Sequence, residues 1–163
     1  MNSQPKRKTT RLPTYDYRLP GVYFVTICTK NKQKLLSTIV GEGLCALPQI
    51  RLTKVGKIVE ASLKYIHENI DGISLDKYVI MPNHVHLLLR IEECSEAGGR
   101  GGPPLHKIIG QFKSFTTHQC NQVLWQRSFH DHVVRGEEDY REIWTYIFEN
   151  PLRWRKDVLY VDE

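Results

Sequence analysis

The sequence predicts an α+β domain in which two helices pack on one face of an antiparallel sheet. Four segments have the β-branched, aromatic or alternating apolar residues of strands, and three have apolar residues at helical spacing. These segments follow one another in the order β-α-β-β-α-β-α. Because a βαββαβ order builds a two-layer sandwich, we expect a ferredoxin-like (RRM-like) fold with one extra C-terminal helix. With 163 residues, the chain is long enough for a single domain.

The first strand and the first helix lie in the N-terminal half. Residues 22–28 are β-branched and aromatic and follow Pro20-Gly21, which predicts a strand. Residues 38–50 are compatible with a loop or a short hairpin. Over residues 52–69, apolar side chains recur at i, i+3, i+4 and i+7, which is typical of an amphipathic helix.

Two further strands are expected on either side of a turn at Pro82-Asn83. The first covers residues 73–81, and the second begins at His84. Side chains alternate between the two faces of a strand, so His84 and His86 share one face. The other face receives four apolar side chains that helices can cover, namely Val85, Leu87, Leu89 and Ile91.

The region after this strand contains a glycine- and proline-rich stretch within residues 92–104. It lacks the Gly-Lys-Ser/Thr ending of a phosphate-binding loop, so a mobile surface loop is expected. A helix is predicted over residues 104–121, with Pro104 in its first turn. Residues 127–134 are predicted to form the last strand.

The final helix is expected over residues 137–150, and Pro151 ends it. At about 100° per residue, Tyr146 and Asn150 lie together on one flank of this helix. An apolar stripe roughly 90° away is expected to dock on the body of the protein. The stripe consists of Tyr140, Ile143, Trp144 and Ile147.

The pair His84 and His86 is a candidate metal site. Imidazole nitrogens bind several divalent ions, and an oxygen donor from elsewhere in the chain would complete the coordination. The pair is equally compatible with two sheet-face histidines that hold no ligand. A second His-x-His, His130-Asp131-His132, lies on the predicted last strand, where its polar and aromatic neighbours favour an edge position.

Positive charge is concentrated at the N-terminus. The chain has 23 Lys and Arg against 18 Asp and Glu, and residues 1–20 supply four of the five net positive charges. We therefore divide the chain into a basic arm, 1–20, and one domain, 21–163. Such an arm suits contact with nucleic acid, or it is a solubilising tail. Tyr15 lies among its basic residues and could stack on unpaired bases. The basic residues are Lys6, Arg7, Lys8, Arg11 and Arg18.

The composition excludes several classes of protein. No apolar run approaches the roughly 20 residues that span a bilayer. The N-terminus lacks the apolar segment of a secretory signal. The four cysteines are scattered without a Cys-x-x-Cys motif, which argues against a zinc knuckle and is compatible with reduced thiols in a cytosol.

Four segments resemble, in order and over nearly the whole chain, the REP-associated tyrosine transposases, a family of bacterial HUH-type, single-tyrosine transposases. They are Tyr15-Asp-Tyr-Arg with Gly21-Val-Tyr-Phe-Val-Thr-Ile-Cys-Thr29, Met81-Pro-Asn-His-Val-His-Leu87, Trp125-Gln-Arg-Ser-Phe-His-Asp-His-Val-Val-Arg135, and Tyr146-Ile-Phe-Glu-Asn-Pro151.

The resemblance implies a metal-dependent endonuclease and strand transferase that acts on single-stranded DNA. The family's tyrosine attacks a phosphodiester and leaves a 5′-phosphotyrosyl link and a free 3′-hydroxyl. By motif, the nucleophile matches Tyr146, and the metal ligands match His84, His86 and Asn150. The chemistry suits Mg²⁺ or Mn²⁺, and two imidazoles make Mn²⁺ at least as good a match.

The resemblance also implies a target, a location and a quaternary state. The family's usual target is a repetitive extragenic palindrome (REP), a DNA hairpin with a short flanking tetranucleotide. A bacterial, cytoplasmic and nucleoid-associated protein is expected, acting as a monomer or as a homodimer. Lys107, Lys113 and Arg127 are candidates for phosphate contacts or are solvated surface charges, and His132 is expected to support the site or contact DNA.

Two other classes of function stay open on the sequence alone. A non-catalytic protein that binds single strands or hairpins would form no covalent adduct. A metal hydrolase that uses a metal-bound water would leave its DNA products unattached, and Tyr146 would then be structural.

Overall fold

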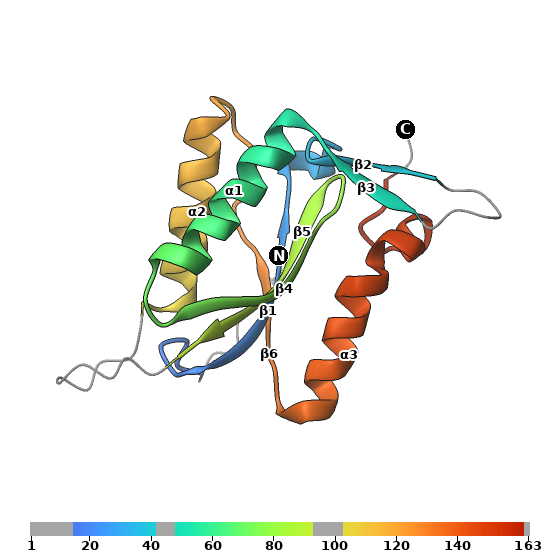
Figure 1. The fold of residues 1–163 in the computed structure, drawn as a ribbon. Helices are drawn as coiled ribbons and strands as arrows, with labels where there is room; N and C mark the ends of the chain where they lie inside the picture. The colour runs from blue at the N-terminus through green and yellow to red at the C-terminus, as the bar shows by residue number, and fades with distance from the viewer. Residues whose placement is uncertain (1–14, 42–47, 93–102, 162–163) are drawn as a thin grey trace, which may run out of the picture.

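A computed structural model describes residues 15–41, 48–92 and 103–161 (Figure 1). The expected arm residues Lys6, Arg7 and Arg11 and most of the glycine-rich loop lie outside these ranges.

The sheet strands are β1 (Gly21–Cys28), β4 (Ile73–Ile80), β5 (His84–Ile91) and β6 (His130–Val133). The helices are α1 (Lys54–Asn69), α2 (Leu105–Gln119) and α3 (Gly136–Glu149). Short 3-10 helices are η1 (Lys30–Lys32) and η2 (Asn150–Lys156), and β2 (Ser37–Val40) pairs with β3 (Gln49–Leu52).

The four-stranded sheet has the order β4-β5-β1-β6, and its three pairings are antiparallel. Helices α1 and α2 lie on one side of this sheet and α3 on the other (Figure 1). This is the predicted βαββαβ sandwich with one extra helix, so the expected fold is confirmed. In the described ranges, none of the helices is long and apolar enough to cross a membrane.

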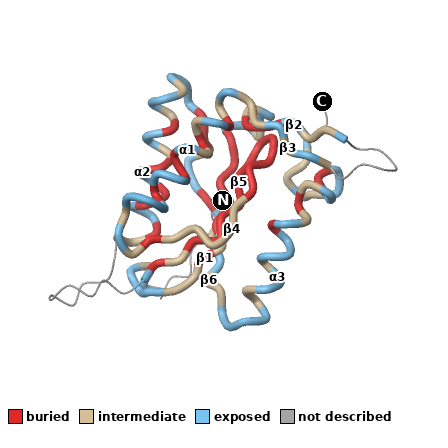
Figure 2. Tube along the Cα trace, viewed as in Figure 1, coloured by how far each residue is buried: buried red, intermediate tan, exposed pale blue. Residues whose placement is uncertain are grey.

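Two apolar clusters hold the layers together. The larger cluster lies between the sheet and helices α1 and α2, and it contains the predicted apolar face of β5: Val85, Leu87, Leu89 and Ile91. The smaller one, built around Leu88, Ile147 and Trp154, lies between the sheet and the C-terminal segment. Figure 2 shows the buried residues concentrated in the central strands, whereas most of α3 is intermediate or exposed. Helix α3 is therefore less buried than the sheet on which it packs.

The structure refines several predicted boundaries. Residues 38–50 overlap both strands of the antiparallel β2–β3 pair, which agrees with the hairpin that the sequence allowed as one of two forms. Helix α3 ends at Glu149, as expected before Pro151, but the chain continues as the 3-10 helix η2 because proline is accepted in a first helical turn. The docking stripe is confirmed only in part, since Trp144 is 37% exposed.

Two helical glycines offer a matched stability test. A Cβ at Gly56, in the first turn of α1, would lie 1.9 Å from the carbonyl oxygen of Leu36, whereas a Cβ at Gly110 in α2 would meet nothing within 4 Å. We expect Gly56→Ala to lower the free energy of unfolding by about 1–3 kcal/mol through overpacking. Gly110→Ala should raise it by about 0.5–1 kcal/mol, because alanine loses less backbone entropy in a helix. Urea unfolding measures both; equal effects would contradict the close packing at Gly56.

Candidate metal and nucleophile site

The two histidines of β5 lie side by side under α3. His84 is 0% and His86 2% exposed, and their ring centroids are 4.4 Å apart. Both point away from the larger apolar cluster because side chains alternate along the strand. The structure thus buries this polar pair on the face of the sheet that α3 covers.

Neighbouring side chains fix the orientation of both rings. The Asn83 side-chain amide donates to the carbonyl oxygen of Leu159 at 2.8 Å, so its oxygen faces Nδ1 of His84 at 2.8 Å as an acceptor. His84 must then carry its proton on Nδ1, which leaves a lone pair on Nε2. In His86, Nδ1 forms a hydrogen bond with the Thr26 hydroxyl at 2.8 Å, and Nε2 faces the hydroxyl of Tyr146 on α3. Partners of this kind orient metal-binding imidazoles in proteins.

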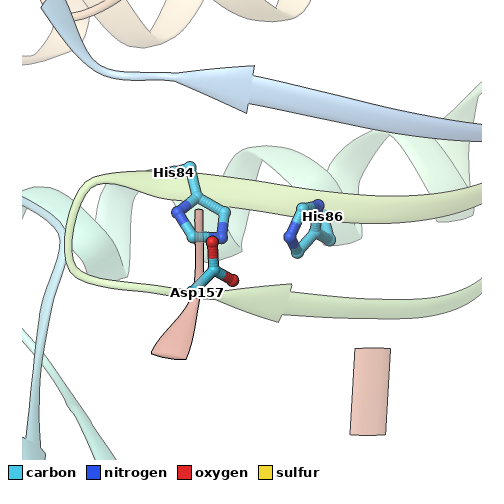
Figure 3. A group of neighbouring side chains, drawn as sticks. All are labelled: His84, His86 and Asp157. Carbon is cyan, nitrogen blue, oxygen red and sulfur yellow. The ribbon is translucent and has the colours of Figure 1, made fainter. Parts of the chain in front are cut away.

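Oxygen donors reach the same spot from the C-terminal segment. Asn150, 2% exposed, donates its side-chain amide to Oδ2 of Asp157 at 2.9 Å. The ligand atoms of His84, His86 and Asp157 lie within 4.8 Å of one another (Figure 3). Sequence reasoning missed Asp157. The available signal was that Asp157 is the only acidic residue in the stretch 150–161.

Two buried atoms of this group lack hydrogen-bond partners among the described residues. They are Nε2 of His84 and Oδ1 of Asn150. Leaving a buried acceptor without a partner costs on the order of 1–3 kcal/mol. A divalent cation is a partner that accepts lone pairs from nitrogen and oxygen together, so the donor set fits such an ion.

Burial also sets the protonation state of the pair. It lowers the pKa of His84 to about 4, with the Asp157 carboxylate acting in the opposite direction and the Lys32 ammonium in the same one. Burial also lowers the pKa of His86 well below its usual value, and His84 adds to this. Both rings are therefore neutral near pH 7, which is the form that binds metals.

Tyr146 on α3 stands next to the pair. Its hydroxyl is 3.4 Å from Nε2 of His86, and its ring packs edge-on against Phe24 with centroids 5.9 Å apart. The residue keeps 39% of its surface exposed. Burial, and then the Asp157 carboxylate, raise the pKa of the phenol. The structure thus brings Tyr146 to the histidine pair.

A β-bulge in β4 holds α3 over this site. The register shifts between Leu75 and Lys77, so Asp76 and Lys77 both face α3. The Asp76 carboxylate accepts a hydrogen bond from the Tyr140 hydroxyl at 3.0 Å and pairs with Arg90 of β5. Lys77 lies over the ring of Trp144, with Nζ 4.2 Å from the centroid. The bulge therefore anchors two consecutive turns of the helix that carries Tyr146.

The second histidine pair differs from the first. His130 and His132 are exposed, and Nε2 of His132 lies 2.8 Å from a carboxylate oxygen of Asp139. The same oxygen accepts the backbone N–H of Arg135 at 2.7 Å. His132 thus supports the beginning of α3, and within the described residues it joins no metal-ligand cluster.

The candidate DNA contacts do not gather around the histidine pair. Tyr15 packs edge-on against Tyr17, and Arg18 pairs with Asp16 at 3.0 Å on the surface. Lys107 is exposed on α2, on the other side of the sheet. The Lys113 ammonium donates to backbone carbonyls of the segment that precedes β6, including that of exposed Arg127 at 3.0 Å. The DNA contacts expected of these residues stay predictions. A hollow of about 310 Å³ beside α2 is lined by His106, Gly110, Lys113, Arg127, Ser128 and Phe129.

The chain resembles known proteins over most of its length, although no family model matches it. It is 32% identical to an uncharacterized protein of Haemophilus influenzae, over 96% of this chain and 94% of that protein. It is 24% identical to the REP-associated tyrosine transposase of Escherichia coli K12, over 85% of this chain and 72% of the relative.

A solved structure shares the fold. It is that of a REP-associated tyrosine transposase bound to a REP hairpin, with a TM-score of 0.64 and 19% identity, covering 88% of this chain and 73% of that one. The similarity to the named transposases covers 85% of this chain. The resemblance to the REP-associated tyrosine transposases that the sequence segments indicated is thus confirmed over most of the chain.

Proposed function

We propose that the protein is a metal-dependent endonuclease and strand transferase for single-stranded DNA that cleaves at hairpin-associated, REP-like sites through a 5′-phosphotyrosine intermediate. One observation carries this proposal. An accessible phenol, that of Tyr146, lies beside two buried neutral imidazoles, and a buried ligand atom of His84 has no partner among the described residues.

The ion would be held by Nε2 of His84, Nε2 of His86 and Oδ1 of Asn150, with Asp157 as a further ligand or as the group that aims the Asn150 amide. Mg²⁺ and Mn²⁺ both accept nitrogen and oxygen ligands, and the two imidazoles favour Mn²⁺. When bound, such an ion polarises the scissile phosphate and offsets the negative charge that develops on it.

The chain's own residues supply the nucleophile and its position. The Tyr146 oxygen forms a bond to phosphorus while the bond from phosphorus to the 3′-oxygen breaks. The phenol proton leaves to solvent, and the departing 3′-oxygen takes up a proton. Phe24 and His86 hold the phenol ring, and the bulge contacts of Asp76 and Lys77 hold the helix. The reverse reaction with another 3′-hydroxyl rejoins strands.

The substrate class follows from access to the site and from the relatives. Tyr146 is part-exposed beside the histidine pair, so a flexible single strand can bring a phosphodiester to it. The structural relative is bound to a REP hairpin, and we extend that ligand to this chain. In this proposal the arm supplies Lys6, Arg7, Arg11, Tyr15 and Arg18 to the DNA. Lys107, Lys113, Arg127 and His132 are the further proposed contacts.

The proposed active site is complete within one chain. Tyr146, the histidine pair and Asn150 all come from the same copy, so catalysis needs no second copy to deliver a residue. We propose that a monomer is active, and a homodimer would carry two such sites.

Incubation of the full chain with a labelled hairpin oligonucleotide and Mn²⁺, followed by denaturing electrophoresis, tests the proposal. We expect a covalent protein–DNA band that disappears when EDTA is added. Bound but uncut DNA would instead identify a non-catalytic binder. Cut DNA without attached protein would identify a hydrolase that uses water as its nucleophile.

Asp157 provides a separate test of the metal site. Asp157→Asn removes a negative charge from the ligand group but keeps an oxygen that can accept from Asn150. We expect Mn²⁺ affinity, measured by titration calorimetry, to fall about 10- to 100-fold. Asp71→Asn, an equivalent change at an exposed carboxylate between α1 and β4, should leave affinity unchanged. Equal affinities for the two variants would exclude Asp157 from the site.

A further inference from the structure

A basic turn follows β1 and supplies none of the proposed ligands or the proposed nucleophile. This basic turn is the segment Lys30–Lys34, which carries lysines at positions 30, 32 and 34. Within it, Asn31 has φ 56° and Lys32 has φ 54°. Asparagine tolerates the left-handed region, but a long side chain such as lysine is rarely found there. Strain of this kind persists only where surrounding contacts enforce it, and it is concentrated at functional sites.

Hydrogen bonds attach the residue that precedes the basic turn to Asn83, in the turn before β5. Thr29, fully buried, donates its backbone N–H to the carbonyl oxygen of Asn83 at 2.9 Å. Its hydroxyl lies 2.7 Å from the carbonyl oxygen of Gln33 and 3.0 Å from that of Asn83. Asn83 is also the residue that orients His84. The basic turn is therefore attached to the residue next to the metal pair.

The basic turn and the nucleophile lie at opposite ends of the histidine pair. Cys28, the last residue of β1, is directly opposite His84 in the sheet, and the turn begins two residues later. Tyr146 lies at the other end, beside His86. Lys34 places Nζ 5.3 Å from the ring centroid of Tyr160, in the segment that carries Asp157.

The three lysines are available to an anion. Among the residues that the structure describes, none of their ammonium groups pairs with a carboxylate. Lys30 and Lys34 are exposed, and Lys32 is half-buried. A lysine ammonium acts on phosphate as a compact point charge.

We propose that the basic turn, with Lys32 at its centre, binds a backbone phosphate of the DNA strand upstream of the cleaved bond. In an in-line displacement the leaving oxygen departs on the side opposite the nucleophile. The strand that ends in the 3′-hydroxyl therefore extends toward His84 and the basic turn. A cation there retains the cut 3′ end for rejoining. This inference rests on the proposed function and names a contact for that reaction.

Two substitutions of Lys32 separate its charge from its backbone conformation. Lys32→Asn removes the charge and introduces a residue that tolerates positive φ, so Tm should stay equal or rise. Lys32→Gln removes the charge alone. Lys57 is exposed on α1, on the opposite side of the sheet, so Lys57→Gln is the matched control for the loss of one positive charge.

Binding is measured by fluorescence anisotropy in EDTA, where no cleavage occurs, with the full chain and a hairpin oligonucleotide that extends upstream of the cleavage position. Both Lys32 variants should bind roughly five- to tenfold more weakly than the unsubstituted chain and the Lys57→Gln control. The slope of log K against log salt should fall by about 0.7, the value for one phosphate of a single strand. With an oligonucleotide that lacks the upstream strand, all four proteins should bind equally.

The outcomes distinguish this inference from the proposed function. If the unsubstituted chain binds none of the oligonucleotides, the proposed function fails. If it binds but the Lys32 variants bind equally well, the basic turn has no role in binding and the proposed function stands. A difference that persists without the upstream strand would overturn the assigned polarity.

Discussion

Tyr146→Phe is expected to abolish the covalent protein–DNA adduct while leaving hairpin binding unchanged. The substitution removes one oxygen atom and keeps the ring that packs against Phe24 and His86. Loss of an enzyme's nucleophile typically reduces the rate by more than about 10⁴-fold, so no adduct should be detectable on a denaturing gel.

Tyr65→Phe is the matched control for this prediction. Tyr65 is 62% exposed on α1, on the opposite side of the sheet, and loses the same atom. This variant should form the adduct at the rate of the unsubstituted chain. An adduct of normal yield in Tyr146→Phe would show that another group attacks the DNA.

The double substitution His84→Ala and His86→Ala is expected to remove binding of the divalent ion and, with it, adduct formation. Because an ion that binds only the folded state raises Tm, Mn²⁺ should stabilise the unsubstituted chain by an amount that grows with concentration. The variant should show no such shift, although its own Tm without Mn²⁺ will differ because two buried side chains are truncated.

The second His-x-His supplies the control for this experiment. His130→Ala with His132→Ala is chemically the same change at exposed positions outside the ligand cluster. It should keep the Mn²⁺-dependent rise in Tm. If the Mn²⁺-dependent rise in Tm is lost in this variant but kept in the variant with His84→Ala and His86→Ala, the metal site lies on β6 instead.

The parts of the fold and site that follow from local periodicity were predictable. Alternation along β5 placed His84 and His86 together and the apolar residues on the helix-covered face. Helical spacing placed Tyr146 and Asn150 on one flank of the predicted final helix. Asn150 is the first residue of η2 in the structure, and yet Tyr146 reaches His86 and Asn150 reaches Asp157. These relationships depend only on the repeat of each element, so a single sequence contains them.

The remaining features depend on packing between distant segments. Asp157 reaches the histidines because η2 turns the chain back and Trp154 packs into the smaller cluster, 5% exposed. No spacing rule connects Asp157 with His84. Similarly, the bulge in β4 changes which face Lys77 occupies, and its ammonium lies over Trp144, which leaves that predicted docking residue at the edge of the interface.

The identity of the modified residue is the most direct test of the central claim. The adduct formed with a hairpin oligonucleotide and Mn²⁺ would be digested with nuclease and protease, and the phosphorylated peptide sequenced by mass spectrometry. We predict a 5′-phosphonucleotide on the side-chain oxygen of Tyr146, together with a free 3′-hydroxyl on the released strand. A modification on any other residue, or a product joined through its 3′ end, would contradict the proposed mechanism.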